Sequence, residues 1–249
     1  MLEIKNLSVR YGEKTVLDNL SFVLRPHRLT VLVGRNGAGK STLFGCVNQQ
    51  VAYTGTITEG EKNLVLIPPR ERAKSIAILP QSLPSPHITG RELVGLGRNP
   101  YLDFTGRLTA ADKRAVENAL QDADAQELAA RYVDTLSGGE KQRILLAMIL
   151  AQNTPIVLLD EPTAHLDLGY EAAFLELLRK LKKERKKTFL LILHDLNLAA
   201  RYADDLIVLD GGHMVFSGTK EECLEKKILE ETFGLRRYTV EDRTFFSAK

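Results

Sequence analysis

Residues 29–42 read L-T-V-L-V-G-R-N-G-A-G-K-S-T, an apolar run that ends in a glycine-rich turn and a lysine. A short apolar run of this kind is typical of a buried parallel strand, and a helix is expected from about residue 38 to 49. The turn from Gly34 to Ser41 fits the pattern G-x-x-x-x-G-K-[ST]. The stretch therefore predicts a strand, a phosphate-binding loop and a helix in succession, which is a unit of an α/β fold.

This loop contains each group that a bound nucleotide needs. Glycines let backbone N–H groups wrap the phosphates, and the start of the following helix adds a favourable field. Lys40 is expected to bridge the β- and γ-phosphates, and the Ser41 hydroxyl to ligate Mg²⁺. The residues predicted to bind nucleotide in this loop are Gly34, Asn36, Gly37, Ala38, Gly39, Lys40, Ser41 and Thr42.

The composition is that of an ordinary globular protein. The chain has 249 residues, of which 44% are hydrophobic and 27% charged. A net charge of +2 gives no general attraction to nucleic acid or to an anionic membrane. The two cysteines, Cys46 and Cys223, lie far apart and suggest neither a disulfide framework nor a metal site. We expect a cytosolic chain without a signal peptide or membrane span, so that any membrane role comes through a partner.

The remaining pattern surrounds the loop with strands and helices. Alternating apolar residues predict two antiparallel strands ahead of the loop, and short apolar runs predict further strands. The expected strands cover 2–9, 16–24, 54–58, 75–79, 156–160 and 188–193, with a hairpin over 206–216. Helices are expected near 109–123, 137–152, 169–184 and 195–203. We predict one domain over 1–249, with an antiparallel β layer, a mixed-sheet core of 1–84 and 154–249, and a helical insertion over 85–153.

A second apolar run, I-V-L-L-D-E over residues 156–161, ends in two carboxylates. A strand that delivers Asp160 beside the loop supplies a charge for the Mg²⁺ shell. Glu161, one residue on, can orient and deprotonate the attacking water. Such a pair is common at strand ends, but together with the loop it predicts hydrolysis.

Three further side chains are weaker candidates on their own. His194 follows the run 188–193 and can reach a γ-phosphate in the crevice of such a sheet, although histidines there also cap or pack. Gln81 follows another strand and can position water or Mg²⁺. Tyr11 either stacks on a purine or packs in the N-terminal hairpin.

Residues 135–143 read T-L-S-G-G-E-K-Q-R, a second glycine-bearing turn at a predicted helix start. Ser137 and Glu140 have the spacing of a capping box, as do Thr109 and Asp112. A capping hydroxyl can still donate its own proton to a phosphate, and the glycine N–H groups would complete an anion site. Because capping alone does not need two glycines, the surplus favours an anion site. The spacing leaves open whose phosphate it binds.

With these motifs in one order, the chain resembles the ATP-binding subunits of ABC transporters over essentially its whole length. The resemblance implies a P-loop NTPase fold that binds ATP and Mg²⁺ and couples hydrolysis to transport. For nucleotide binding it implies an adenine-stacking Tyr11, a Walker A loop at 34–42, and a signature at 136–140 that contains Ser137, Gly138, Gly139 and Glu140. For hydrolysis it implies a Q-loop at Gln81, a Walker B motif ending at Asp160, the general base Glu161 and the switch residue His194. It also implies a D-loop at 164–167 that contains Asp167. Mg²⁺ would be held by Ser41, Gln81 and Asp160. His165 departs from the commoner small or polar D-loop residue.

The resemblance also implies partners. In this family two ATPase domains bind head to tail, so we expect a homodimer in which the signature of one chain closes on the ATP held by the other. We expect permease subunits docked beside Gln81 and residues 82–105, an indirect link to a substrate-binding protein, and a peripheral position on the cytoplasmic side of the membrane. Four stretches resemble the corresponding sequences in ATPase subunits of importers for ferric siderophores, haem or cobalamin: 79–81, 94–101, 109–112 and 166–170.

Other interpretations are less well supported. An ATPase for another transported solute, such as a metal ion, shares all of these motifs. A nucleic-acid ATPase of the same family usually has two ATPase domains or long coiled coils, and the near-neutral charge disfavours a large nucleic-acid surface. A regulatory module without turnover is disfavoured by Glu161 and His194.

Overall fold

The computed structural model describes residues 1–164, 166–240 and 243–248. The chain divides into two compact units, which are described separately: the first unit comprises residues 1–67 and 188–249, and the second unit residues 68–187. The predicted separation of a helical subdomain over 85–153 from the rest of the chain stays a prediction.

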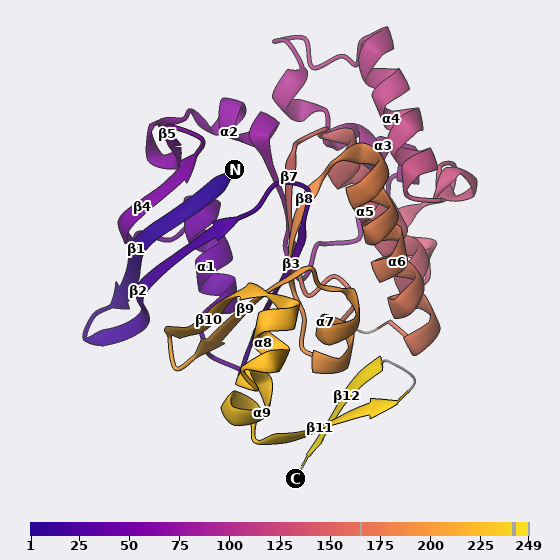
Figure 1. The fold of residues 1–249 in the computed structure, drawn as a ribbon. Helices are drawn as coiled ribbons and strands as arrows, with labels where there is room; N and C mark the ends of the chain where they lie inside the picture. Colours follow the sequence, from indigo (N-terminus) through magenta and orange to yellow (C-terminus); the bar gives the residue numbers. More distant parts are fainter. Residues whose placement is uncertain (165, 241–242, 249) are drawn as a thin grey trace. The chain divides into compact units, whose positions relative to one another are not determined.

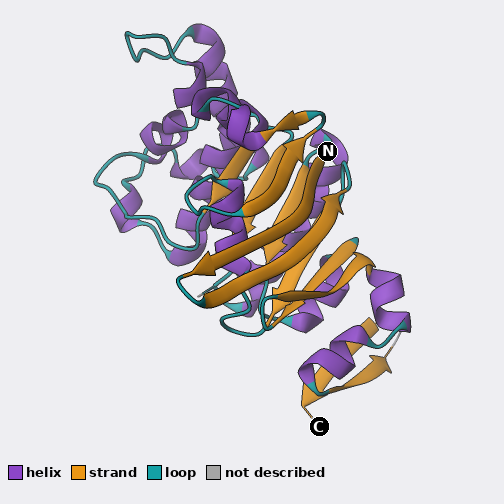
Figure 2. Ribbon diagram, turned by 90° about the vertical axis from the view of Figure 1, so that its left-hand side faces the viewer, coloured by secondary structure: helices purple, strands orange, loops and turns teal. Residues whose placement is uncertain are grey.

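The first unit begins with an antiparallel sheet (Figures 1 and 2). Its strands lie in the order β2-β1-β4-β5, with β1 at Leu2–Tyr11, β2 at Lys14–Leu24, β4 at Thr54–Glu59 and β5 at Lys62–Asn63. Leu2 and Ile4 of β1 are buried on one side of a register shift, and Leu7 and Val9 are buried on the other side, so that the two residues of each pair are two positions apart. This period of two is what a half-buried strand requires, and the predicted antiparallel layer is confirmed.

A second set of strands in the first unit supports the glycine-rich loop. Its order is β10-β9-β3-β8, with β3 at Leu29–Gly34, β8 at Thr188–Ile192, β9 at Asp205–Asp210 and β10 at His213–Thr219. Strand β3 is parallel to both neighbours, and Val31 is paired with Leu191 of β8 and Leu206 of β9. All five residues of β8 are buried, as expected for an inner parallel strand. The predicted strands and hairpin are confirmed.

The helices of the first unit are short. They are α1 at Lys40–Val47, α7 at Leu196–Tyr202, α8 at Lys220–Glu225 and α9 at Ile228–Phe233, with a 3₁₀ turn at Leu64–Leu66. A C-terminal hairpin, β11 at Leu235–Val240 and β12 at Arg243–Ala248, follows α9 (Figure 1). The Phe246 N–H donates to Asn197 Oδ1 of α7 at 2.6 Å. The sequence pattern predicts no element after residue 216, so α8, α9 and this hairpin are found in the structure alone.

The second unit contains a parallel strand pair and most of the longer helices. Strands β6 at Ile76–Leu79 and β7 at Ile156–Asp160 are parallel, with Ile78 opposite Leu158. The helices are α2 at Pro69–Ser75, α3 at Gly90–Leu96, α4 at Ala110–Asp122, α5 at Gly138–Ala151 and α6 at Leu168–Arg185, with 3₁₀ turns at 99–101, 126–128 and 133–135. No helix of the described residues is long and apolar enough to cross a bilayer.

Capping boxes begin three of the helices of the second unit, α3, α4 and α5. The predicted boxes Thr109–Asp112 and Ser137–Glu140 are both present, at α4 and α5. A third box, Thr89–Glu92, starts α3. A buried ion pair stabilises the same region, because Arg98 Nε donates to Asp112 Oδ1 at 2.9 Å and Arg98 Nη1 to Ala151 O at 2.7 Å. These contacts join α4 to the end of α5 through the segment after α3.

Candidate nucleotide-binding and hydrolysis site

The glycine-rich loop of residues 34–42, called the nucleotide loop below, joins β3 to α1 in the first unit. Lys40 is the first residue of α1 and is 6% exposed. Its ammonium group donates to Gly34 O at 2.8 Å and to Arg35 O at 3.2 Å. The lysine thus closes the loop on itself, which places its positive charge at the start of the helix.

Two glycines of the nucleotide loop are required by its geometry. Gly39 has a φ of 93°, and a Cβ there would lie 2.3 Å from Leu17 Cδ2. Gly34 has an ordinary φ, but a Cβ there would lie 2.6 Å from the carbonyl oxygen of Leu209. No side-chain hydrogen bond caps α1 within the described part of the chain. The N–H groups of its first turn, which lack intrahelical acceptors, are therefore available to an anion.

Two other predicted residues lie in the first unit. Tyr11 ends β1 and is 56% exposed, so its ring is accessible to a purine. His194 lies between the end of β8 and the start of α7 and is also exposed. Both positions are compatible with the predicted roles, which stay predictions.

In the second unit the structure joins Gln81 to Glu161. The Gln81 Nε2 amide donates to Glu161 Oε2 at 2.6 Å, across 80 positions of sequence. Asp160 is the last residue of β7 and is 8% exposed, while Glu161 has a φ of 50°. This left-handed backbone, which is uncommon for glutamate, turns the chain directly after the strand. As a result, the two neighbouring carboxylates have different surroundings: that of Asp160 is buried, and that of Glu161 contacts Gln81.

Ser137 to Glu140, called the signature turn below, starts α5 and is capped by its own side chains. The Ser137 N–H donates to Glu140 Oε2 at 2.8 Å, and the Glu140 N–H donates to Ser137 Oγ at 3.4 Å. Arg131 Nη1 donates to the other Glu140 oxygen at 2.5 Å. Hydrogen bonds from the backbone and side chain of Ser137, and then the Arg131 guanidinium, hold the pKa of the Glu140 carboxyl below its ordinary value.

The two glycines of the signature turn differ in what surrounds them. A Cβ at Gly139 would lie 2.8 Å from the Tyr170 ring of α6, whereas a Cβ at Gly138 would meet Leu166 Cδ2 at 3.8 Å, an ordinary contact. Gly139 therefore has a packing reason that the sequence did not reveal. Gly138 is the glycine of this turn that neither capping nor close packing requires.

Asp167, predicted to contact nucleotide, is the N-cap of α6. Its Oδ1 accepts from Gly169 N at 3.1 Å and from Tyr170 N at 3.0 Å. His165, whose role in the D-loop the sequence left open, lies outside the described residues. Asp167 thus helps to place Tyr170, the residue that covers Gly139.

The predicted Mg²⁺ ligands have suitable chemistry. Hydroxyl, carboxylate and amide oxygens are the hard donors that Mg²⁺ prefers, usually together with phosphate oxygens and water. Ser41 is exposed in the first turn of α1, and Asp160 presents a buried carboxylate at a strand end. Among the described residues, no cluster of three histidine, cysteine or acidic side chains could hold a metal alone. The donor set fits an ion that is held jointly by protein and nucleotide.

Sequence reasoning missed three residues around the signature turn. Arg131 contacts Glu140, Tyr170 covers Gly139, and Lys141 hydrogen-bonds to residues of the Q-loop segment. Lys141 belongs to the stretch 135–143, but its hydrogen-bond partner Ser85 lies 56 positions earlier in the chain. Such pairings arise from tertiary packing, and a single sequence carries no signal for them.

Comparisons with known proteins agree with this geometry. The profile of the family described as ABC transporter matches residues 17–164, more than half of the chain. The iron(3+)-hydroxamate import ATP-binding protein of Bacillus subtilis is 36% identical over 243 residues, which are 97% of this chain and 90% of the relative. The hemin import ATP-binding protein of Pseudomonas aeruginosa is 42% identical over 242 residues, 94% of this chain and 93% of the relative.

A solved structure shares the fold. A bacterial ABC transporter cassette, determined as a dimer, superimposes with a TM-score of 0.76 at 26% identity, covering 88% of this chain and 99% of that one. The predicted fold class, an α/β nucleotide-binding fold with an antiparallel layer and a mixed sheet, is confirmed.

Proposed function

The chain belongs to the ABC transporter family as one of its ATPase subunits, and we propose that it powers import of a ferric siderophore, haem or cobalamin. The matched relatives are import subunits for an iron(3+)-hydroxamate and for hemin. The similarity to these import subunits carries the proposed cargo class. The hydrogen bond from Gln81 to Glu161 carries the proposed coupling, because it joins the predicted water-activating carboxylate to the segment that leads to α3.

Different residues of the chain bind the nucleotide and activate the water in the proposed hydrolysis. The N–H groups of the nucleotide loop and Lys40 bind the phosphates, and Tyr11 stacks on the adenine. Glu161 orients the attacking water and accepts its proton, while Gln81 and His194 hold the water and the γ-phosphate in place. Ser41, Asp160 and Gln81 would hold Mg²⁺, which, when bound, neutralises charge that develops on the phosphates.

Two copies of the chain complete each site. In this proposal the signature turn of one copy binds the γ-phosphate of the ATP that the nucleotide loop of the other copy holds. The Ser137 hydroxyl accepts a capping hydrogen bond from Glu140 N–H and donates its proton to the Glu140 carboxylate, so that proton would have to turn from Glu140 to the phosphate, whereas Gly138 leaves the backbone bare. Asp167 lies at the same edge of the second unit, as the cap of α6. Hydrolysis would then require dimer closure.

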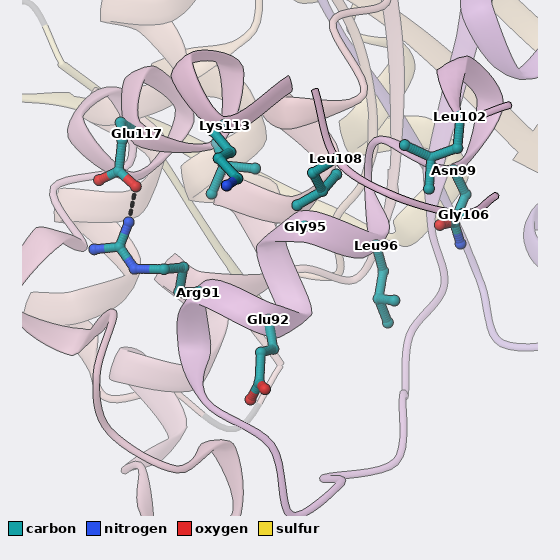
Figure 3. A pocket seen from close by; sticks show the side chains of 11 residues that line it. Arg91, Glu92, Gly95, Leu96, Asn99, Leu102, Gly106, Leu108, Lys113 and Glu117 are labelled. Atoms are coloured by element: carbon teal, nitrogen blue, oxygen red, sulfur yellow. Dashed lines mark ion pairs between the residues drawn. The ribbon is translucent and has the colours of Figure 1, made fainter. Parts of the chain in front are cut away.

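A groove in the second unit supports a contact with permease subunits (Figure 3). The cavity measures about 560 Å³ and is lined by residues of α3, α4 and the segment between them. Arg91 of α3 forms an ion pair with Glu117 of α4 along one side. Leu96, the last residue of α3, is 49% exposed in the groove, and Phe104, between α3 and α4, is fully exposed. An apolar groove with a charged edge suits an amphipathic helix.

The groove supports a permease contact with residues that follow Gln81. A helix of the permease would lie between α3 and α4, so the contact would include part of the predicted segment of 82–105 and would extend beyond it into α4. The chain would thus be peripheral to the membrane on its cytoplasmic side, and would act on a substrate-binding protein indirectly, through the permease.

Dimer formation tests the proposal. Glu161→Gln should bind ATP and Mg²⁺ without turnover, because the carboxylate that accepts the proton is gone. We expect a stable dimer in sedimentation or size-exclusion measurements, and a monomer for Lys40→Ala under the same conditions. A monomeric Glu161→Gln chain at saturating ATP and Mg²⁺ would exclude the ATP-closed homodimer.

A mixture of two inactive variants tests site-sharing. Lys40→Ala removes the phosphate-binding lysine, and Ser137→Arg blocks the signature turn. In a mixed dimer with shared sites, one site carries both changes and the other is intact, so part of the ATPase activity should return. Absence of recovery in confirmed mixed dimers would contradict the sharing.

A further inference from the structure

The segment of residues 82–88, called the connecting segment below, joins Gln81 to the groove helix α3. It has no regular secondary structure and contains Pro84 and Pro86. Proline lacks a backbone N–H group, so the segment cannot be held by a regular ladder of backbone hydrogen bonds. Its position must depend on other contacts, and these come from the two sides of the signature turn.

Lys141 of α5 forms hydrogen bonds with the middle of the connecting segment. Its ammonium group donates to Ser85 Oγ at 2.6 Å and to Leu83 O at 3.1 Å. Among the described residues, these two hydrogen bonds are the side-chain hydrogen bonds made to residues 82–86. Lys141 lies in the first turn of α5, one residue after Glu140 of the signature turn. Because the donor is charged, these hydrogen bonds are stronger than neutral ones.

The end of the connecting segment is held by residues just before the signature turn. His87 Nδ1 lies 2.8 Å from Asp134 Oδ2, and its ring stacks on Tyr132 with centroids 4.3 Å apart and planes 3° from parallel. The backbone adds a hydrogen bond from Val133 N to Ile88 O at 2.9 Å. Tyr132 to Asp134 lead into Ser137 through a single 3₁₀ turn.

These contacts join two functional groups that the sequence separates by more than fifty positions. One end of the connecting segment is Gln81, which contacts Glu161 at 2.6 Å. Its middle and far end are fixed to the residues on both sides of Ser137. All of them belong to the second unit.

We propose that Lys141 is a positioning residue that fixes the connecting segment to the signature helix, so that Gln81 and Ser137 are displaced together. On the proposed function, a permease helix in the groove would then act through one displacement on two sites. It would move Gln81, which contacts Glu161 of the same chain. It would also move the signature turn, which in the proposed dimer binds the ATP held by the other copy.

Hydrogen exchange and kinetics of three variants test this role. Lys141→Met removes the charged donor and keeps the length of the side chain, whereas Lys141→Arg keeps a donor cation. Lys183→Met, at an exposed lysine of α6, is the matched control. In the full chain, Lys141→Met should raise amide exchange at Ile88 and at Val133, whose N–H groups donate to Pro86 O and Ile88 O, by about tenfold or more, because it removes two charge-assisted hydrogen bonds. Lys141→Arg should restore most of the protection.

The kinetics distinguish positioning from a general structural effect. Lys141→Met should lower the kcat for ATP about tenfold and leave KM within about twofold, since the nucleotide loop is untouched. Ser85→Ala, at an exposed loop position that cannot prevent folding, should give a smaller change of the same kind. Its effect should disappear when Lys141→Met is already present, because both substitutions break the same hydrogen bond.

Three results would overturn the proposal. One is amide exchange in Lys141→Met equal to that in Lys183→Met. Another is faster exchange with unchanged kcat, which would show that the segment does not control Gln81. The last is additivity of Ser85→Ala and Lys141→Met. The exchange measurement uses no nucleotide, so it can succeed or fail separately from the proposed ATPase cycle, which fails if the wild-type chain does not hydrolyse ATP.

Discussion

The nucleotide loop and the signature turn are both glycine-bearing helix starts, but they satisfy their backbones in opposite ways. The start of α1 has a left-handed Gly39 as its N-cap and no acidic residue in its first turn, and within the described residues no side chain caps it. The start of α5 has a complete capping box, in which Ser137 Oγ accepts from the Glu140 N–H and the Glu140 carboxylate accepts from the Ser137 N–H. The first helix therefore lacks an anion, whereas the second already has one of its own.

This difference explains how two similar turns can serve different steps. An uncapped helix start with a lysine attracts phosphate without help. A capped start, in which a carboxylate partly compensates the helix dipole, is a weaker anion site in the isolated chain. It needs a phosphate that another binding site already holds. We therefore expect substitutions in the nucleotide loop to abolish binding and substitutions in the signature turn to impair a later step.

The largest effect is expected at Lys40. Lys40→Met keeps the buried stem but removes the charge, so ATPase activity should fall by about 10² to 10³ and ATP affinity should fall with it. Isothermal titration and steady-state kinetics measure both. Lys62→Met, at an exposed lysine of β5, is the control. Retention of ATP affinity in Lys40→Met would remove the basis of the comparison.

The next effect separates the two signature glycines. Gly139→Ala should lower the free energy of unfolding by about 1–3 kcal/mol, because its Cβ meets the Tyr170 ring. A second change, Tyr170→Ala, should restore part of this loss. Gly138→Ala should leave stability within about 1 kcal/mol of wild type, since its Cβ meets nothing closer than 3.8 Å. It should nevertheless lower ATPase activity while ATP affinity is kept. Full activity of Gly138→Ala would show that the bare backbone there is not needed.

A smaller effect measures the cap itself. Ser137→Ala removes the hydroxyl that accepts from Glu140 N, and should cost about 1 kcal/mol of unfolding free energy in urea. Asn36→Ala, in the uncapped nucleotide loop, should cost almost nothing. Equal losses in both variants would mean that the two helix starts do not differ in capping.

The smallest effect is a pH dependence at Glu140. Its pKa is lowered in the folded chain, chiefly by the Ser137 hydrogen bonds, so its contribution is present above the unfolded pKa and is lost as pH falls through the folded one. The difference in unfolding free energy between wild type and Glu140→Gln should therefore shrink as the pH falls below the ordinary range of a glutamate carboxyl and through the lowered folded pKa. A difference that stays constant over this range would contradict the role given to the carboxylate.

Much of this architecture could be predicted from local pattern. The strands around the nucleotide loop, the capping boxes at Thr109 and Ser137, and the parallel runs that end at Gly34 and Asp160 follow from apolar periodicity and side-chain spacing. The C-terminal hairpin could not be predicted in this way. It is held by pairing between its own strands and by Asn197, almost fifty positions earlier.

By itself, the sequence determined the candidate residues and their chemistry, because motif spacing fixes which groups a loop or a strand end presents. The tertiary structure decided which of them meet: Gln81 with Glu161, Gly139 with Tyr170, and Lys141 with Ser85. It also gave Gly139 a packing reason beside its predicted role. The physical reason is range. Capping and turns involve residues three or four positions apart, whereas a contact between distant segments depends on how all the intervening chain folds.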